Sequence, residues 1–158
     1  MSKSVFDKFK LKDKILTSII FVSVVFIFIQ KIFFGSPVSV DNERTTEITV
    51  NGTKILVEIV ETVDEKYRGL SFRESLSENE GMLFLHENMG MHEYVMRNMK
   101  FDLDFIFIRD EEIVDIAKNV SKDYRGVAKG ATMYNKVLEM TAGWVNENDV
   151  KLGGEIKQ

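Results

Sequence analysis

The chain has 158 residues, 44% of them hydrophobic, which is enough for one membrane-spanning segment and one compact domain. It contains no cysteine, so disulfides, zinc-thiolate sites, iron-sulfur clusters and cysteine nucleophiles are excluded. Residues 45–158 carry 14 Lys or Arg against 21 Asp or Glu, and this acidic balance argues against a nucleic-acid partner.

The amino-terminal part of the chain predicts a membrane anchor. Residues 1–14 are basic, fifteen of the twenty residues 15–34 are Ile, Leu, Val or Phe with Lys31 near the end of the run, and residues 35–46 are a polar linker. A helix of about 20 residues crosses the roughly 30 Å hydrocarbon layer, so we expect residues 15–34 to be a transmembrane helix. The lysines before it predict a cytoplasmic amino terminus and an extracytoplasmic domain over residues 47–158. We expect a retained single-pass anchor in the cell membrane, and a long cleaved signal peptide is the alternative.

A hairpin and a short helix open the predicted outer domain. "TEITVNGTKILVEIVET" places two alternating apolar runs around Asn51 and Gly52, a pair that accepts the positive φ angles of a tight turn. Thr62 followed by Glu65 has the pattern of a capping box, which predicts that a helix begins there. Three apolar residues are expected on one face of this helix: Val63, Tyr67 and Leu70.

Short strands are expected over the rest of the chain. They are predicted in six stretches, "GMLFLH", "EYVMRNM", "LDFIFI", "EEIVDIAKNVS", "YNKVLEMTAGW" and "VKLGGEIK". The unbroken apolarity of "LDFIFI" indicates a strand buried on both faces. Together these elements predict a mainly β fold with minor α content, a small mixed β-barrel or sandwich with one or two short helices.

Six ordered segments of the chain resemble the domain of unknown function 192 family. They are "RGLSFRESL" (68–76), "GMLFLHEN" (81–88), "YVMRNM" (94–99), "LDFIFI" (103–108), "VLEMTAGW" (137–144) and "VKLGGEI" (150–156). The resemblance covers roughly residues 47–158. It implies a small β-rich domain, and it implies little about activity because the family has no agreed biochemical role.

The chain departs from the usual pattern of that family at several positions. The pattern reads aromatic-Trp-Met-Lys-Asn-Thr and then Pro-Leu-Asp. Here Val95 stands in place of the tryptophan and Arg97 in place of the lysine, while Met99 replaces the threonine and Asp102 the proline. Gly154 stands where the last aspartate is usual. A family site built on that tryptophan or aspartate would be altered in this chain.

Five polar residues in the matched segments are candidates for a binding site: Arg73, Arg97, Asn98, Asp104 and Glu139. We expect a pocket in which Arg97 and Asn98 bind an anionic or hydroxylated ligand and the two acidic residues position it. A carboxylate beside an apolar strand needs a cation or hydrogen-bond donors, and Arg73 or Arg97 could provide a bidentate partner. The alternative is a structural ion-pair network that fixes the register of the strands.

The chemistry of the chain favours a ligand-binding or protein-interaction module over an enzyme. Paired carboxylates could support a hydrolase such as a glycosidase, provided that they flank one substrate. The sequence contains no Gly-x-Ser-x-Gly, phosphate-binding loop, dinucleotide fingerprint or His-Glu-x-x-His motif. The expected partners are therefore the membrane, through the amino-terminal helix, and a small molecule or a protein.

A copper site is a further hypothesis. His86, Met89, Met91 and His92 offer imidazole and thioether groups, which suit copper(I), in a domain expected outside the cytoplasm. The alternative is that methionine fills gaps in the core and that the histidines lie in an exposed connecting segment. We expect no cofactor, and copper(I) is the alternative.

Overall fold

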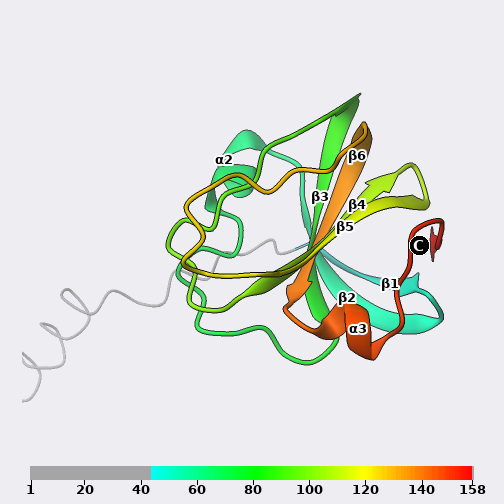
Figure 1. Ribbon diagram of the computed structural model, residues 1–158, viewed down its shortest axis with the longest axis horizontal. Coiled ribbons are helices and arrows are strands. Elements are labelled where there is room, and N and C mark those ends of the chain that lie inside the picture. Colours follow the sequence, from blue (N-terminus) through cyan, green and yellow to red (C-terminus); the bar gives the residue numbers. More distant parts are fainter. Residues whose placement is uncertain (1–43, 158) are drawn as a thin grey trace, which may run out of the picture. The chain divides into compact units, whose positions relative to one another are not determined.

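The computed structural model describes residues 44–157 (Figure 1), so the predicted anchor at 15–34 lies outside the described residues. The elements of this part are β1 (Thr45–Val50), β2 (Thr53–Val60), α2 (Val63–Arg68), β3 (Glu80–Gly90), β4 (Leu103–Arg109), β5 (Glu112–Val120), β6 (Tyr134–Thr141), α3 (Trp144–Glu147) and β7 (Ile156–Lys157). Between residues 44 and 157, no helix is both long and apolar enough to span a bilayer.

The seven strands of the described part form one strongly curled sheet in the order β5-β4-β6-β3-β2-β1-β7. Only the β2–β3 pair is parallel among the strand pairs described. At one end the two edges meet, because Ile113 N donates to Gly154 O at 2.8 Å and Ile156 N donates to Glu111 O at 2.9 Å. The prediction of a mainly β fold with one or two short helices is confirmed for residues 44–157, and the barrel or sandwich expected there is a single sheet curled into a half-barrel.

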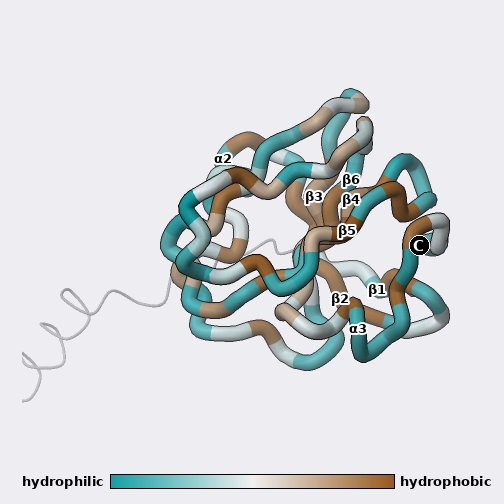
Figure 2. The backbone as a smooth tube through the Cα atoms, in the orientation of Figure 1, coloured by the Kyte–Doolittle hydropathy of each residue, from teal (hydrophilic) through white to brown (hydrophobic). Residues whose placement is uncertain are grey.

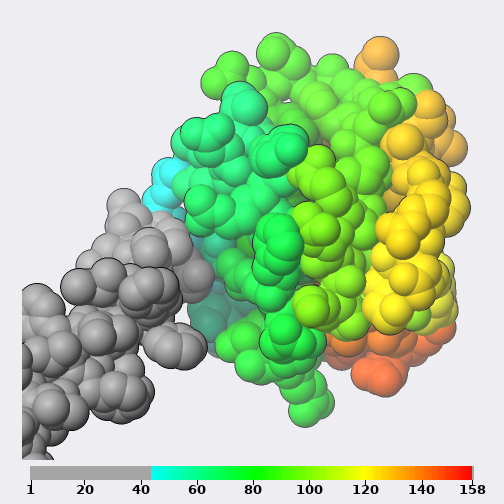
Figure 3. Space-filling model, turned by 90° about the vertical axis from the view of Figure 1, so that its left-hand side faces the viewer, coloured from blue at the N-terminus to red at the C-terminus, as the bar shows by residue number. Residues whose placement is uncertain are grey.

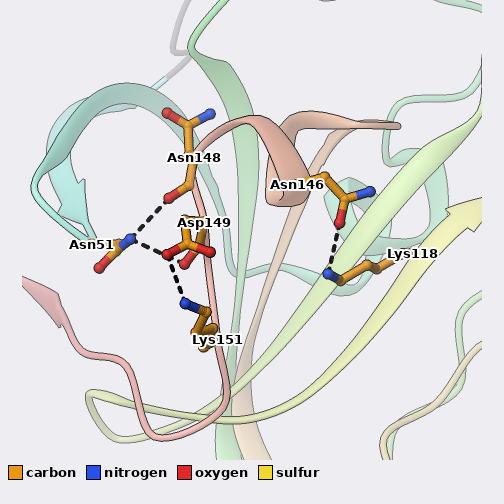
Figure 4. A network of polar contacts seen from close by, with 6 residues as sticks. All are labelled: Asn51, Lys118, Asn146, Asn148, Asp149 and Lys151. Carbon is orange, nitrogen blue, oxygen red and sulfur yellow. Dashed lines mark hydrogen bonds and ion pairs between the residues drawn. The ribbon is translucent and has the colours of Figure 1, made fainter.

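The predicted hairpin at the start of the domain is confirmed. Asn51 and Gly52 have φ angles of 49° and 84°, and β1 and β2 pair antiparallel on either side of them. Figure 4 shows the Asn51 side-chain amide pointing at the segment after α3, where it donates to Asn148 O at 2.8 Å and Asp149 O at 3.2 Å. This amide links the first hairpin to the last part of the chain.

The connection between the parallel strands β2 and β3 carries α2. Parallel neighbours need a crossover connection, and here residues 61–79 supply it. The capping box is confirmed, since the Thr62 hydroxyl accepts from Glu65 N and the Glu65 carboxylate accepts from Thr62 N. The expected apolar face does not pack as a unit: Val63 and Tyr67 are 82% and 71% exposed, and only Leu70 is buried.

Two apolar cores lie on the two faces of the central strands. In β4, Ile106 and Ile108 pack into one core, whereas Phe105 and Phe107 pack into the other. The prediction that "LDFIFI" is buried on both faces is therefore confirmed. Figure 2 shows the apolar residues concentrated where β3, β4 and β6 cross. The second core is completed by residues outside the strands: Leu70, Tyr94, Met96 and Ala128.

Three sequence-based expectations about strands are wrong. "EYVMRNM" is not a strand, because Tyr94 makes a single bridge with Ala128 and the chain then turns at Asn98, whose φ is 57°. The closing strand is reduced to the two residues of β7. The segment around His86 is not a connection, since β3 continues as far as Gly90.

Candidate ligand-binding cavity

An open cavity of about 220 Å³ lies between the end of α2 and residues 93–99. Its walls come from these two segments and from residues of β3, β4 and β6. Figure 3 views the molecule from the side on which the α2 segment and the 93–99 segment lie next to each other. We refer to this space as the α2 cavity.

Two backbone turns hold the walls of the α2 cavity together. The Ser71 hydroxyl donates to Arg97 O at 2.9 Å, and Phe72 N donates to Asn98 O at 2.9 Å. Both Phe72 and Asn98 have positive φ angles, 68° and 57°, a conformation that asparagine tolerates better than most residues. These bonds fix the segment after α2 against the segment that follows Tyr94.

The floor of the α2 cavity is the carboxyl group of Glu139. This residue lies on β6, level with Met82 of β3 and Phe105 of β4, and its exposed fraction is 6%. None of the hydrogen bonds within residues 44–157 involves its carboxyl group. Burial raises the pKa of Glu139 to about 8, so the group is mostly a neutral acid at pH 7.

A neutral hydrogen-bonded pair stands beside Glu139. The Tyr94 hydroxyl and the Nε2 atom of His86 are 2.7 Å apart, and both residues line the cavity. Burial is the main cause that raises the pKa of Tyr94 far above its ordinary value and lowers the pKa of His86 to about 4. The interior of the cavity therefore offers three polar groups, all uncharged at pH 7.

Arg97 lies at the mouth of the cavity and is held against Tyr67. Its guanidinium carbon is 4.0 Å from the centre of the Tyr67 ring, and its Nη2 donates to Tyr67 O at 3.0 Å. A cation over an aromatic ring in this geometry is stabilised by about 0.5–1 kcal/mol at an exposed site. The contact orients the guanidinium while leaving several of its N–H donors available.

The mouth of the α2 cavity is lined by cations. Lys66, Arg68 and Arg97 all border it, and no ion pair among the described residues involves any of the three. The one carboxylate at the mouth, Glu93, is 3.7 Å from the ammonium of Lys129. Since Glu139 is mostly neutral at pH 7, the cavity carries a positive balance within an acidic domain.

Of the five predicted site residues, the structure brings Arg97 and Glu139 to this cavity. Arg73 pairs instead with Glu58 of β2, and both side chains are partly buried. The side chain of Asn98 is exposed, and its contribution to the walls is the backbone carbonyl that binds Phe72. Two of the five predicted residues, Arg97 and Glu139, therefore line the cavity.

Asp104 has a different environment from the one predicted. It is fully buried, and its Oδ1 accepts from Asn119 N at 2.7 Å while its Oδ2 accepts from Gly143 N and Val145 N, each at 3.0 Å. Three backbone donors, rather than an arginine, satisfy this carboxylate. It fixes the turn into α3 and the end of β5, which is a structural role.

The two histidines among the four candidate copper ligands are not arranged to bind one ion together. The rings of His86 and His92 are stacked, with centroids 3.5 Å apart and planes 4° apart. The lone pair of an imidazole nitrogen lies in the ring plane, so two parallel rings cannot both direct one at the same ion. Met89 and Met91 are 40% and 49% exposed. Within residues 44–157, no group of three or more His, Cys, Asp or Glu side chains is placed to hold a metal.

Sequence reasoning missed several cavity residues: Lys66, Tyr67, Arg68 and Tyr94. Arg68 and Tyr94 lie within the segments that carry the resemblance to the 192 family, which was the one signal available for them. Lys66 and Tyr67 lie on a short helix whose charged residues would ordinarily face solvent.

Comparison with known proteins gives a fold and a family. The structure of a protein of unknown function from Novosphingobium aromaticivorans is 30% identical, with a TM-score of 0.70 over 78% of this chain and 90% of that one. The structure of a proposed transcription regulator from Sinorhizobium meliloti is 23% identical, with a TM-score of 0.70 over 73% of this chain and 94% of that one, a likeness that shows the fold alone. No curated protein matches the chain. The model of the DUF192 family, described as "Uncharacterized ACR", matches residues 46–158, and the chain belongs to this family.

Proposed function

We propose that this protein is a membrane-anchored, extracytoplasmic domain that binds a small molecule in the α2 cavity. The observation that carries the binding proposal is Glu139, a carboxyl group with an exposed fraction of 6% and no hydrogen bond to a described residue. No fully buried side-chain oxygen of residues 44–157 lacks a hydrogen-bond partner, so the unbonded carboxyl oxygens of Glu139 are open to the cavity and to a partner from outside the chain. A ligand with a donor or acceptor would supply that partner.

The shape and lining of the cavity support the same proposal. Small-molecule sites are concave and mostly apolar, with a few polar groups placed to orient the ligand. The α2 cavity has this composition: apolar walls from residues such as Leu70, Phe84 and Leu103, with Tyr94 and Glu139 as inner polar groups.

Asp104 and Glu139 project from opposite faces of the sheet, so they do not flank one substrate as a paired-carboxylate hydrolase requires.

The test of ligand binding uses a variant that closes the cavity. Val95 borders the mouth and is 55% exposed, so Val95→Trp places a large ring over the opening. Val127→Trp is the matched control, since Val127 is 40% exposed and does not line this cavity. In thermal-shift screening of the full chain in detergent, we expect compounds that stabilise the wild type and the control but not Val95→Trp. The proposal would be contradicted if no compound stabilised Val127→Trp against heat more than it stabilised Val95→Trp.

The anchor proposal rests on the apolar run of residues 15–34 and the lysines before it. Its test is a blot of cell fractions with a tag at the amino terminus. We expect a full-length product in the membrane fraction, whose outer domain is digested by protease added to the non-cytoplasmic side. A shortened, soluble product that has lost the tag, detected with an antibody against the outer domain, would show that the segment is cleaved.

A further inference from the structure

Polar side chains lie at both ends of the α2 cavity, and apolar side chains line the walls between them. The cations Lys66, Arg68 and Arg97 border the mouth, and Glu139 and Tyr94 lie at the inner end. The walls between these ends include Leu70, Phe84 and Leu103, whose exposed fractions are 1–2%. A ligand complementary to this cavity has a polar group at each end and an apolar segment between them.

From this arrangement we infer that the ligand is a small hydroxycarboxylate, with its carboxylate among the cations at the mouth and its hydroxyl on Glu139. This inference deepens the proposed function and rests on it. The guanidinium of Arg97 is planar, matches a carboxylate bidentately, and is already oriented by the Tyr67 ring. An amine at the same place would be repelled by three cations.

The volume of the cavity limits the size of the ligand. A cavity of about 220 Å³ is smaller than the roughly 300–1,000 Å³ typical of small-molecule sites, so the part of the ligand inside it is small. A straight chain of about six carbons between the two polar ends satisfies this limit.

The inner end selects for a hydroxyl group. A protonated carboxyl both donates and accepts, so it can hold a hydroxyl with two hydrogen bonds. A methyl group at the same place can form neither hydrogen bond and would displace solvent from the Glu139 carboxyl, so we expect it to bind about tenfold more weakly than a hydroxyl. The structure therefore predicts preference for a hydroxyl over a methyl at the end of the ligand remote from its carboxylate.

Four six-carbon probes test the inference by isothermal titration against the full chain in detergent at pH 7. They are 6-hydroxyhexanoate, hexanoate, 1,6-hexanediol and 6-amino-1-hexanol. We expect 6-hydroxyhexanoate to bind with a Kd below about 1 mM, hexanoate and the diol each about tenfold more weakly, and the amino alcohol not at all. Equal affinity for all four, or tighter binding of the amino alcohol, would overturn the inference.

Two variants test whether Arg97 contacts the carboxylate of the ligand and whether Glu139 contacts its hydroxyl. Arg97→Met keeps the aliphatic stem and removes the charge, so affinity for 6-hydroxyhexanoate falls about tenfold while affinity for the diol is unchanged. Arg125→Met is the matched control, because Arg125 is exposed and does not line the α2 cavity. Glu139→Leu removes the preference for 6-hydroxyhexanoate over hexanoate, and a preference that survives this change would refute the role of Glu139.

The outcome also separates this inference from the proposed function. If 6-hydroxyhexanoate does not bind but another compound does, and Val95→Trp blocks that compound, the ligand class is wrong and the binding cavity stands. If no compound distinguishes Val95→Trp from Val127→Trp, both are wrong.

Discussion

Asp104 and Glu139 lie on neighbouring antiparallel strands, yet their side chains project from opposite faces of the sheet. The register pairs Asp104 with Met140 and Phe105 with Glu139, which shifts the two acids by one residue relative to each other. Because side chains alternate between faces along a strand, this shift separates the two carboxyl groups. One acid becomes part of the scaffold and the other becomes the floor of a cavity.

Replacing Asp104 is expected to destabilise the domain. Asp104→Asn puts an amide among three backbone N–H donors, so at least one donor loses its acceptor, and the free energy of unfolding falls by about 2–4 kcal/mol. Unfolding is followed by the fluorescence of Trp144, the only tryptophan in the chain, which is 5% exposed. The matched control is Asp102→Asn, where the exposed carboxylate accepts a single backbone bond from Lys122. Equal losses for the two variants would contradict the structural role of Asp104.

Glu139 should make the domain less stable as the pH rises. Its pKa is about 8 in the native state and near 4.5 when unfolded, so between these values the unfolded state binds fewer protons and stability falls with increasing pH. Glu139→Gln removes this dependence, and at pH 9 it is expected to stabilise the domain by on the order of 3 kcal/mol. Unfolding of both proteins in urea at pH 4.5, 6, 7.5 and 9 measures the effect. A constant difference across this range would refute the raised pKa.

His86 should make the domain less stable as the pH falls into the acid range. Its pKa is lowered from 6.5 to about 4, chiefly by burial, so the unfolded state binds more protons in this interval and stability falls as the pH falls through it. His86→Gln keeps a group that can bond to Tyr94 but cannot become charged. We expect its stability, relative to wild type, to improve from pH 8 to pH 4.5, as measured by thermal unfolding. A relative stability that does not change with pH would contradict this account.

The stacked histidines lead to a prediction about copper. In the described arrangement His86 and His92 cannot coordinate one ion together, so we expect the full chain to bind copper(I) no more tightly than micromolar in competition with a chelator. The double variant Met89→Leu and Met91→Leu is then expected to change little. Binding that is much tighter and is lost in that variant would show that the rings separate and that the copper hypothesis is correct.

The elements that could be predicted from the sequence are those that local chemistry determines. Asn51 and Gly52 impose a tight turn, Thr62 and Glu65 cap a helix, and the unbroken apolarity after Leu103 marks a strand buried on both faces. Each of these signals acts over a few residues. The structure agrees with all three.

The parts that could not be predicted depend on tertiary contacts. Apolar residues such as Tyr94 and Met96 are buried without belonging to a strand, because loops rather than a second sheet cover one face of the central strands. The separation of Asp104 from Glu139 depends on the register of β4 against β6, which no short motif specifies. Lys66 and Arg68 become part of a site only because the crossover carries α2 to the 93–99 segment.

The division of the α2 cavity between a rigid floor and a peripheral mouth has a consequence for how binding preferences can change. The floor belongs to strands buried on both faces, where most substitutions would disturb a core. The mouth comes from a short helix and a turn, and its residues include the half-buried Lys66 and the exposed Arg68, Val95 and Arg97. On the proposed function, exchanges at these four positions are expected to alter ligand preference while the buried strands stay intact. Substitutions intended to change the ligand preference of the cavity are therefore best made first at its mouth.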